Sequence, residues 1–331
     1  MEKLIQEFPA QLRESVEIAQ KTNLQIPSKK FSNIAVCGLG GSGIGARIVS
    51  QWLEEELQIP VTIVQNYTIP KFIDENTLVI GSSYSGNTEE TISALNACKE
   101  RGAEITGISS GGNLMAFCAK NNFNFIHVPG GLPPRAALGY SIVQLVKVLE
   151  SYKLISSECF QQFLPAAAFL EAHTSEIQEI AKEIVKVINN TTNVIYAEAP
   201  YESVALRGKQ QFNENSKFLC HYHVIPEMNH NELLGWGSGS EKDSVIFLQT
   251  EDMHPSNKKR FELTQKIISK KTNKVISVFA KGSNKMERSM YLIYVLDWAS
   301  NYLGLARNED VTEIRAIDYL KGELAKLAAT N

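Results

Sequence analysis

Val36-Cys-Gly-Leu-Gly-Gly-Ser-Gly43 is the stretch that decides the fold of this chain. It follows an apolar run at 33–37 and precedes a helical pattern, so its glycines form a turn between a strand and a helix. Short apolar runs and helical patterns then alternate up to residue 127. We expect strands at 33–37, 61–64, 77–81, 104–108 and 124–127, and helices at 1–23, 43–57, 89–101 and 113–121. Such alternation indicates a parallel sheet buried between two layers of helices.

The alternation gives way to helical patterns near residue 136 and then starts again. Helices are expected at 136–152, 158–173, 175–189, 203–216, 257–270, 285–303 and 312–329, and strands at 193–198, 218–224, 244–248 and 274–279. The length of 331 residues suits two domains better than one. We therefore predict an α/β protein of two doubly wound domains, 1–152 and 153–331, each a mainly parallel sheet flanked by helices.

The composition limits the partners and the location of the protein. The net charge of −3 gives no electrostatic signature of binding to nucleic acid or to an anionic membrane. The first residues are charged and amphipathic, unlike a signal peptide, and no window reaches the roughly 18 uninterrupted apolar residues that a membrane span needs. The five cysteines are scattered and include no CxxC pair. We expect a cytoplasmic protein with reduced thiols and with neither nucleic-acid nor membrane partners.

The glycine stretch is open to three interpretations. Gly38, Gly40 and Gly43 satisfy the dinucleotide-binding pattern G-x-G-x-x-G in its strand–turn–helix context. The dinucleotide-binding pattern also requires a carboxylate at the end of the second strand to bind the ribose. This chain has Gln65-Asn66 at that place. A glycine turn at a helix N-terminus binds other anions equally well, through free N–H groups and the helix dipole. A turn that is merely tight is the third reading.

A second stretch, Ile80-Gly-Ser-Ser-Tyr-Ser-Gly-Asn-Thr-Glu-Glu-Thr91, also lies between a strand and a helix. Hydroxyl residues in such a place often serve only as helix caps, but a cap needs one of them and this loop supplies several. Several hydroxyls and the helix amides together ligate a phosphate without a cationic side chain. We predict a phosphate site made of Gly41, Ser42, Ser83, Ser85 and Thr88.

The segment SSYSGNTEET resembles the phosphate-binding signature of sugar-isomerase (SIS) domains. Together with GLGGSG before it, PPRAALGY after it, and the later segments GKQQFNENSK, EMNHNE and AIDYLKGEL, it resembles the bifunctional phosphoglucose/phosphomannose isomerase family over nearly the whole chain. The resemblance implies two SIS domains. It also implies an aldose–ketose isomerase that interconverts glucose 6-phosphate, and mannose 6-phosphate as well, with fructose 6-phosphate through an enediol, without metal or other cofactor.

The resemblance further implies roles for four residues. Glu214, in the segment Asn213-Glu-Asn215, matches the base that moves hydrogen between C2 and C1. His230 matches the histidine that opens the sugar ring and that the neighbouring subunit supplies, which implies a homodimer with a shared active site. Arg135 is expected to stabilise the enediolate, and Lys321 to reach the sugar near its ring oxygen. Without the resemblance, each of the four has an alternative interpretation as a surface side chain. That alternative is favoured for Glu214 and nearly as good for Lys321, whereas the helix dipole disfavours it for Arg135.

Several alternatives stay open at this stage. A threonine near Lys321 is associated with acceptance of mannose 6-phosphate, and either Thr312 or Ile314 occupies that place. His221 and His223 lie on one face of a strand, but with no third ligand in sight a packing or interface role is favoured over a metal. The competing functions are another SIS isomerase, acting on an amino-sugar or pentose phosphate, a sugar-phosphate sensor without catalysis, and a dinucleotide oxidoreductase.

Overall fold

The computed structural model describes residues 1–328. Within it the chain forms two units, each defined by its internal contacts. The N-terminal unit comprises residues 3–174 and 281–291, and the C-terminal unit comprises residues 1–2, 175–280 and the described residues from 292 onward. Each unit is therefore made of more than one stretch of chain. The division of the domains at residues 152 and 153 stays a prediction.

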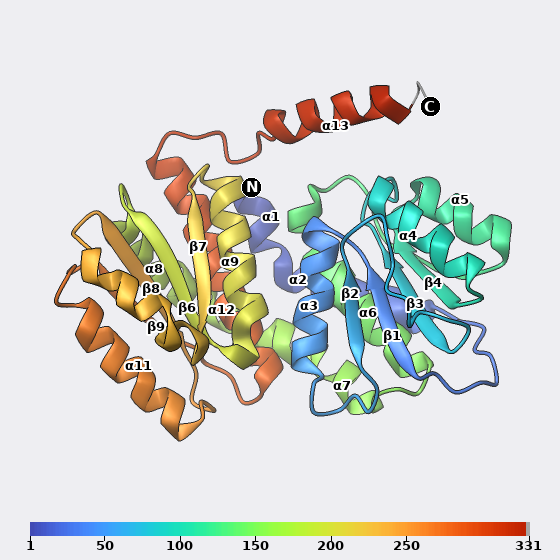
Figure 1. Ribbon diagram of the computed structural model, residues 1–331, viewed down its shortest axis with the longest axis horizontal. Coiled ribbons are helices and arrows are strands. Elements are labelled where there is room, and N and C mark those ends of the chain that lie inside the picture. Colours follow the sequence, from blue (N-terminus) through green and yellow to red (C-terminus); the bar gives the residue numbers. More distant parts are fainter. Residues whose placement is uncertain (329–331) are drawn as a thin grey trace. The chain divides into compact units, whose positions relative to one another are not determined.

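The N-terminal unit is built on a five-stranded parallel sheet, drawn from blue to green in Figure 1. Its strands are β1 (Asn33–Cys37), β2 (Val61–Val64), β3 (Thr77–Ser82), β4 (Glu104–Ser109) and β5 (Asn124–His127). They lie in the order β2-β1-β3-β4-β5, and every neighbouring pair is parallel. The chain changes direction across the sheet between β1 and β3. In open α/β sheets, ligands bind at this switch point, beyond the carboxyl ends of the strands.

Helices cover both faces of this sheet, as the alternation predicts. They are α3 (Gly40–Trp52), α4 (Glu89–Glu100), α5 (Gly112–Asn121) and α6 (Leu138–Ser151). Alternate residues of β1 point to opposite faces: Ile34 and Val36 meet side chains of α3 and α6. Ala35 and Cys37 belong to the core formed with α4 and α5. Further helices are α1 (Glu2–Gln6) and α2 (Phe8–Lys21), and α2 packs against α6.

The C-terminal unit repeats this plan with four parallel strands. They are β6 (Thr192–Glu198), β7 (Cys220–Ile225), β8 (Asp243–Gln249) and β9 (Val275–Phe279), in the order β7-β6-β8-β9. On one face, Tyr196 and Phe247 form a core with Phe261 of α11 (Pro255–Ile268). On the other face, Ile195 lies against α9 (Glu202–Asn215) and α12 (Lys285–Ala306). The prediction of two α/β domains with mainly parallel sheets is confirmed.

The helix bounds correct the expectations at several places. The two helices expected at 158–173 and 175–189 are a short α7 (Ser157–Gln161) and one continuous α8 (Phe163–Ile188). Thr174, which falls between the two expected helices, lies inside α8, where its hydroxyl donates to the carbonyl of Leu170 at 3.0 Å. The single helix expected at 1–23 is divided into α1 and α2, and the predicted end of the last helix at residue 329 lies outside the described residues.

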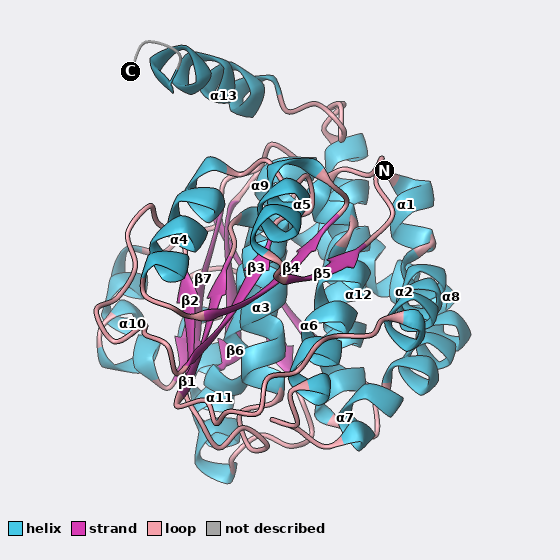
Figure 2. Ribbon diagram, turned by 90° about the vertical axis from the view of Figure 1, so that its right-hand side faces the viewer, coloured by secondary structure: helices cyan, strands magenta, loops and turns pink. Residues whose placement is uncertain are grey.

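Smaller elements complete the described chain. Short 3-10 turns lie at Pro134–Ala136, Ala199–Tyr201, Glu227–His230 and Trp236–Ser238, α10 spans Glu232–Gly235, and α13 spans Arg315–Ala328. Figure 2 shows the strands running between their covering helices. Among residues 1–328, none of the helices has the length and apolar character required to cross a membrane. The five cysteines are buried and carry no disulfide.

A buried ion pair links α9 to α12 in the C-terminal unit. The Nη2 of Arg207 donates to Oδ2 of Asp297 at 2.6 Å, and the two side chains are 3% and 7% exposed. Burial raises the pKa of Asp297, while the guanidinium of Arg207 and a hydrogen bond from Gln211 act in the opposite direction. Removal of one partner therefore lowers the free energy of unfolding more than removal of both.

We expect Arg207→Met to lower the free energy of unfolding of the protein by about 3–5 kcal/mol, because it leaves the carboxylate of Asp297 buried without its cation. The double variant Arg207→Met/Asp297→Leu recovers most of that loss. Urea-induced unfolding followed by circular dichroism measures both. Arg13→Met, which removes the exposed pair with Glu171, is the matched control and costs at most about 1 kcal/mol. A double variant as unstable as the single one contradicts this account.

Candidate active site

Two loops with hydroxyl side chains meet at the switch point of the N-terminal sheet. Ser42 lies in the first turn of α3 and is buried, and its Oγ accepts a hydrogen bond from the backbone N–H of Tyr84 at 3.1 Å. The neighbouring Ser83 is also buried, and its hydroxyl lies 2.9 Å from the hydroxyl of Thr88. Ser85 is exposed and accepts from the N–H of Asn87 at 3.3 Å. The structure thus brings the predicted phosphate-binding side chains to one place.

The first amides of two helices face the same place. Leu39 and Thr88, both within the described residues, occupy the N-cap positions of α3 and α4 without a capping hydrogen bond from the side chain. The hydroxyl of Thr88 points instead to that of Ser83. Helix starts that carry no side-chain cap keep their N–H groups available for an anion, and the helix dipoles add to the attraction.

Gly41 brings the first turn of α3 next to the backbone of Arg135. A Cβ on Gly41 would lie 2.6 Å from the carbonyl oxygen of Pro134 and 3.4 Å from the backbone nitrogen of Arg135. Only glycine allows the first turn of α3 to approach the 3-10 turn at Pro134–Ala136 so closely. Arg135 is 4% exposed and is not the solvated arginine that a helix start often carries. The glycine stretch therefore allows close contact between the backbone of α3 and that of the 3-10 turn.

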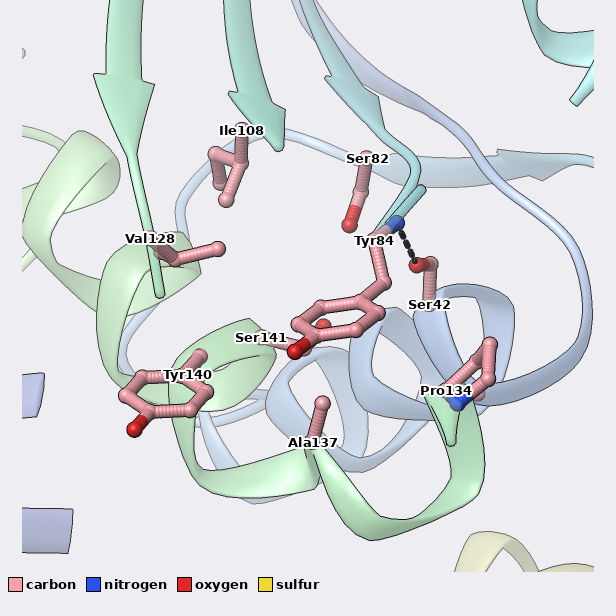
Figure 3. A pocket seen from close by; sticks show the side chains of 10 residues that line it. Ser42, Ser82, Tyr84, Ile108, Val128, Pro134, Ala137, Tyr140 and Ser141 are labelled. Carbon is pink, nitrogen blue, oxygen red and sulfur yellow. Dashed lines mark hydrogen bonds between the residues drawn. The ribbon is translucent and has the colours of Figure 1, made fainter. Parts of the chain in front are cut away.

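A small cavity lies behind the loops, and Figure 3 shows the side chains around it. It is lined by Ser42, Ser82, Tyr84, Tyr140 and Ser141, among others, and its volume of about 10 Å³ fits roughly one water molecule. The cavity is therefore too small to hold a sugar, and the side chains around it belong to the inner wall of the site.

Tyr84 connects the loops that surround this cavity, and sequence reasoning missed it. Its hydroxyl donates to the carbonyl of Pro129 at 2.9 Å and accepts from the N–H of Leu132 at 3.1 Å. Burial raises the pKa of Tyr84 above its ordinary value. Ser110 donates to the carbonyl of Tyr84 at 2.7 Å. The sequence signal that could have pointed to this connection is the second hydroxyl-and-glycine stretch, Ser109-Ser-Gly-Gly112, at the end of the next strand.

In the C-terminal unit, Glu214 lies at the amino edge of the sheet. It occupies the last turn of α9, and its neighbour Asn213 accepts from the N–H of Cys220, the first residue of β7, at 2.9 Å. Figure 1 shows α9 alongside β7. Lys217 donates to the carbonyl of Glu214 at 3.1 Å and also to the carbonyl of Asp310. The segment that leads into α13 therefore passes close to Glu214.

Thr312 and Ile314 both belong to that segment. Thr312 is exposed, and Oδ1 of Asp310 accepts from its N–H at 2.8 Å and from its hydroxyl at 2.6 Å. These bonds lower the pKa of Asp310. Ile314 is half-buried, and Lys321 lies on α13 with its side chain exposed. The structure thus brings Thr312, through Asp310 and Lys217, to the neighbourhood of Glu214.

His230 lies at the opposite, carboxyl edge of the same sheet. It ends the 3-10 turn Glu227–His230, which follows β7, and its side chain is exposed. The length of β7, Cys220–Ile225, separates the two edges by about 16 Å at 3.3 Å per residue. Within one C-terminal unit, Glu214 and His230 therefore do not form one site. Among residues 1–328, no group of three or more His, Cys, Asp or Glu side chains is arranged to hold a metal ion.

Comparisons with known proteins identify two SIS domains in the chain. Residues 28–131 match the model of the SIS domain, and residues 177–324 match that of the bacterial phospho-glucose isomerase C-terminal SIS domain. The chain is 34% identical to a bifunctional phosphoglucose/phosphomannose isomerase of Caldicellulosiruptor bescii, over 97% of each chain. The chain belongs to the bifunctional phosphoglucose/phosphomannose isomerase family. Another member, from Thermoplasma acidophilum, is 36% identical and matches 89% of this chain and 90% of its own.

A solved structure shows the same fold at much lower identity. The C-terminal domain of glucosamine-fructose-6-phosphate aminotransferase from Francisella tularensis superposes with a TM-score of 0.73 at 13% identity, over 94% of this chain and 97% of that one. Membership of the isomerase family, confirmed by the relatives, sets the dinucleotide interpretation of the glycine stretch aside. In this family member, Gly41 packs against Pro134 and no ribose carboxylate follows β2.

We expect Gly86→Ala to damage the candidate phosphate loop. A Cβ there would lie 1.9 Å from the carbonyl oxygen of Gly111, and the φ of Gly86 is +72°. Overpacking and strain together lower the free energy of unfolding by about 2–4 kcal/mol. Urea unfolding measures this, and calorimetry measures a weaker affinity for inorganic phosphate.

The matched control for that variant is Gly131→Ala. Gly131 has a φ of +91°, and no described atom lies within 4 Å of its added Cβ. The control therefore carries the strain alone, about 1 kcal/mol. Equal losses of stability and of phosphate affinity in the two variants contradict the contact with Gly111.

Proposed function

We propose that the protein is a cytoplasmic, homodimeric isomerase that interconverts glucose 6-phosphate and fructose 6-phosphate without a metal, and that accepts mannose 6-phosphate as well. The observation that carries the proposal is the cluster of hydroxyls and helix starts at the switch point, with the buried Arg135 beside it. Neutral donors bind a phosphate dianion here although the net charge of the chain is −3. Family membership supplies the reaction type.

The chemistry divides among the residues as follows. The hydroxyls of Ser42, Ser83, Ser85 and Thr88 hold the 6-phosphate together with the amides around Gly41. His230 moves a proton between the ring oxygen and the anomeric hydroxyl, which opens the ring. Lys321 assists at the ring oxygen.

Isomerisation of the open chain is a transfer of hydrogen. Glu214 removes the C2 proton while the carbonyl oxygen at C1 takes up a proton, which gives the enediol. Return of a proton to C1 and loss of the proton on O2 then give the ketose, so atoms and charge balance. Arg135 stabilises the negative oxygen as it develops. Glucose and mannose 6-phosphate share this enediol, so tolerance of both depends on the surroundings of C2, where Thr312 or Ile314 is placed.

The homodimer is supported by the split between Glu214 and His230. The two residues lie at opposite edges of one sheet, about 16 Å of strand apart, yet the reaction needs both at one sugar. A two-fold dimer resolves this, because each protomer then supplies its His230 to the site that contains the Glu214 of the other.

We expect Glu214→Gln to lower kcat on glucose 6-phosphate by about 10²–10⁴-fold with little change in KM, because the base is lost and the phosphate anchor is intact. A coupled assay measures both constants. Glu202→Gln, at the other end of α9, is the control and keeps the wild-type rate.

The same reaction in heavy water tests the mechanism. Wild-type enzyme incorporates solvent deuterium at C2 of the recovered aldose, because the proton on a carboxylate exchanges with solvent. Absence of any exchange indicates a hydride shift. A near-normal kcat in Glu214→Gln places the base elsewhere, and either outcome refutes the assignment.

A mixing experiment tests the shared site. Glu214→Gln and His230→Ala are each expected to be inactive, and equal amounts of the two regain roughly a quarter of the wild-type activity after subunit exchange, because half the dimers are hybrids with one intact site of two. Mass spectrometry of the intact dimers confirms the exchange. If hybrids form and activity does not return, both residues serve one subunit's site.

A further inference from the structure

A hydrogen-bonded network in the C-terminal unit lies beside His230 and plays no part in the reaction described so far. Tyr196 of β6 and His223 of β7 are direct neighbours across the parallel pair. Both reach the carboxylate of Glu232: the hydroxyl of Tyr196 donates to Oε1, and Nδ1 of His223 lies 2.7 Å from Oε2. The Nε1 of Trp236 donates to the hydroxyl of Tyr196 at 2.9 Å. Both oxygens of the carboxylate are therefore engaged.

The network fastens the segment 227–236, which contains His230, to the sheet. Met228 and Trp236 enter the core that Tyr196 shares, and they anchor the two ends of the segment. Glu232 fastens its middle, only two residues after His230. The segment carries few regular backbone bonds of its own, since it consists of a four-residue 3-10 turn and a four-residue helix.

Further contacts stiffen the join between these two turns. Asn231 accepts from the N–H of Glu232 at 2.5 Å, and its amide donates to Glu227 at 2.9 Å. The φ and ψ of Asn231 are −146° and −67°, outside the regular helical region. The chain therefore bends directly after His230, and the carboxylate of Glu232 holds the bend against the sheet.

We infer that Glu232, held by Tyr196 and His223, is a positioning residue that fixes the direction of His230 for ring opening. The inference rests on the proposed function, because it assigns His230 that step. An exposed histidine on a short turn samples many orientations, whereas proton transfer to a sugar oxygen needs one of them. Apolar contacts at its two ends are sufficient to hold the segment in the fold. The polar network between them therefore contributes more to the orientation of His230 than to stability.

The test compares Glu232→Ala with the conservative Glu232→Gln. The alanine variant loses both bonds, and we expect kcat on glucose 6-phosphate and the enzyme-catalysed exchange of its α and β anomers to fall by about 10- to 100-fold. The glutamine variant recovers most of both rates, because an amide still accepts from Tyr196 and donates to the other tautomer of His223. KM, and the affinity for an acyclic hydroxamate phosphate that imitates the enediolate, stay within about threefold, since that ligand needs no ring opening.

A double-mutant cycle separates positioning from general stabilisation. Because Glu232 acts through His230, Glu232→Ala has no further effect on anomer exchange in a His230→Ala background. Additive losses overturn the inference, as does an unchanged kcat in Glu232→Ala. The matched controls are Tyr222→Phe and Glu202→Ala, which remove a tyrosine–glutamate contact of 3.4 Å next to His223 in the chain, and both retain the wild-type rates.

Amide hydrogen exchange supplies a readout that does not depend on activity. In Glu232→Ala, we expect the amides of residues 228–235 to exchange at least about tenfold faster, while those of β6 and β8 keep their protection. Unchanged exchange in that segment overturns the inference whatever the kinetics show. Wild-type protein without isomerase activity refutes the proposed function instead, and the exchange measurement alone then decides whether the network holds the segment.

Discussion

The parallel arrangement of strands is the constraint on which the rest of the structure depends. Every strand of a parallel sheet ends at the same edge, so the loops after β1, β3 and β4 are collected at one place without long excursions. The same constraint separates the two ends of β7 in the C-terminal unit. Residues that follow the strand, such as His230, lie at one edge, and those at the end of the antiparallel helix before it, such as Glu214, lie at the other.

Strand positions were predictable because each strand is a short apolar run bounded by glycine or polar residues. All nine predicted strands are present, three with the predicted bounds and six with shifts of one or two residues at one or both ends. Helix ends were less predictable. Thr174 and Ser175 have the composition of a cap, yet the hydroxyl of Thr174 bonds back to Leu170 and the helix continues. Whether a hydroxyl caps or bonds backward depends on the backbone that precedes it, which sequence alone does not fix.

The proximity of the hydroxyl residues of the candidate phosphate site was predictable for the same reason as the strands, because these residues follow strand ends that must be neighbours. Tyr84 and Glu232 were not. Tyr84 acts through a backbone N–H and a hydroxyl that bridge separate loops. Glu232 meets His223 only after the chain has bent at residues 226–231, and it meets Tyr196 only through the pairing of β6 with β7. Contacts of this kind belong to the tertiary fold and leave no local pattern.

The proposed function assigns phosphate binding and charge stabilisation by Arg135 to the N-terminal unit, and proton transfer to the C-terminal unit. In the proposed function, hydroxyls and helix amides of the N-terminal unit bind the phosphate. Interlocked loops hold these groups in position, and none of them changes its charge during the reaction. The proposed acid and base both belong to the C-terminal unit, on a helix end and on a fastened turn. A phosphate that binds equally well in substrate, enediol and product lowers KM without discriminating among them. Under this proposal, the acceleration arises where charge moves, so we expect contacts that orient Glu214 and His230 to act on kcat.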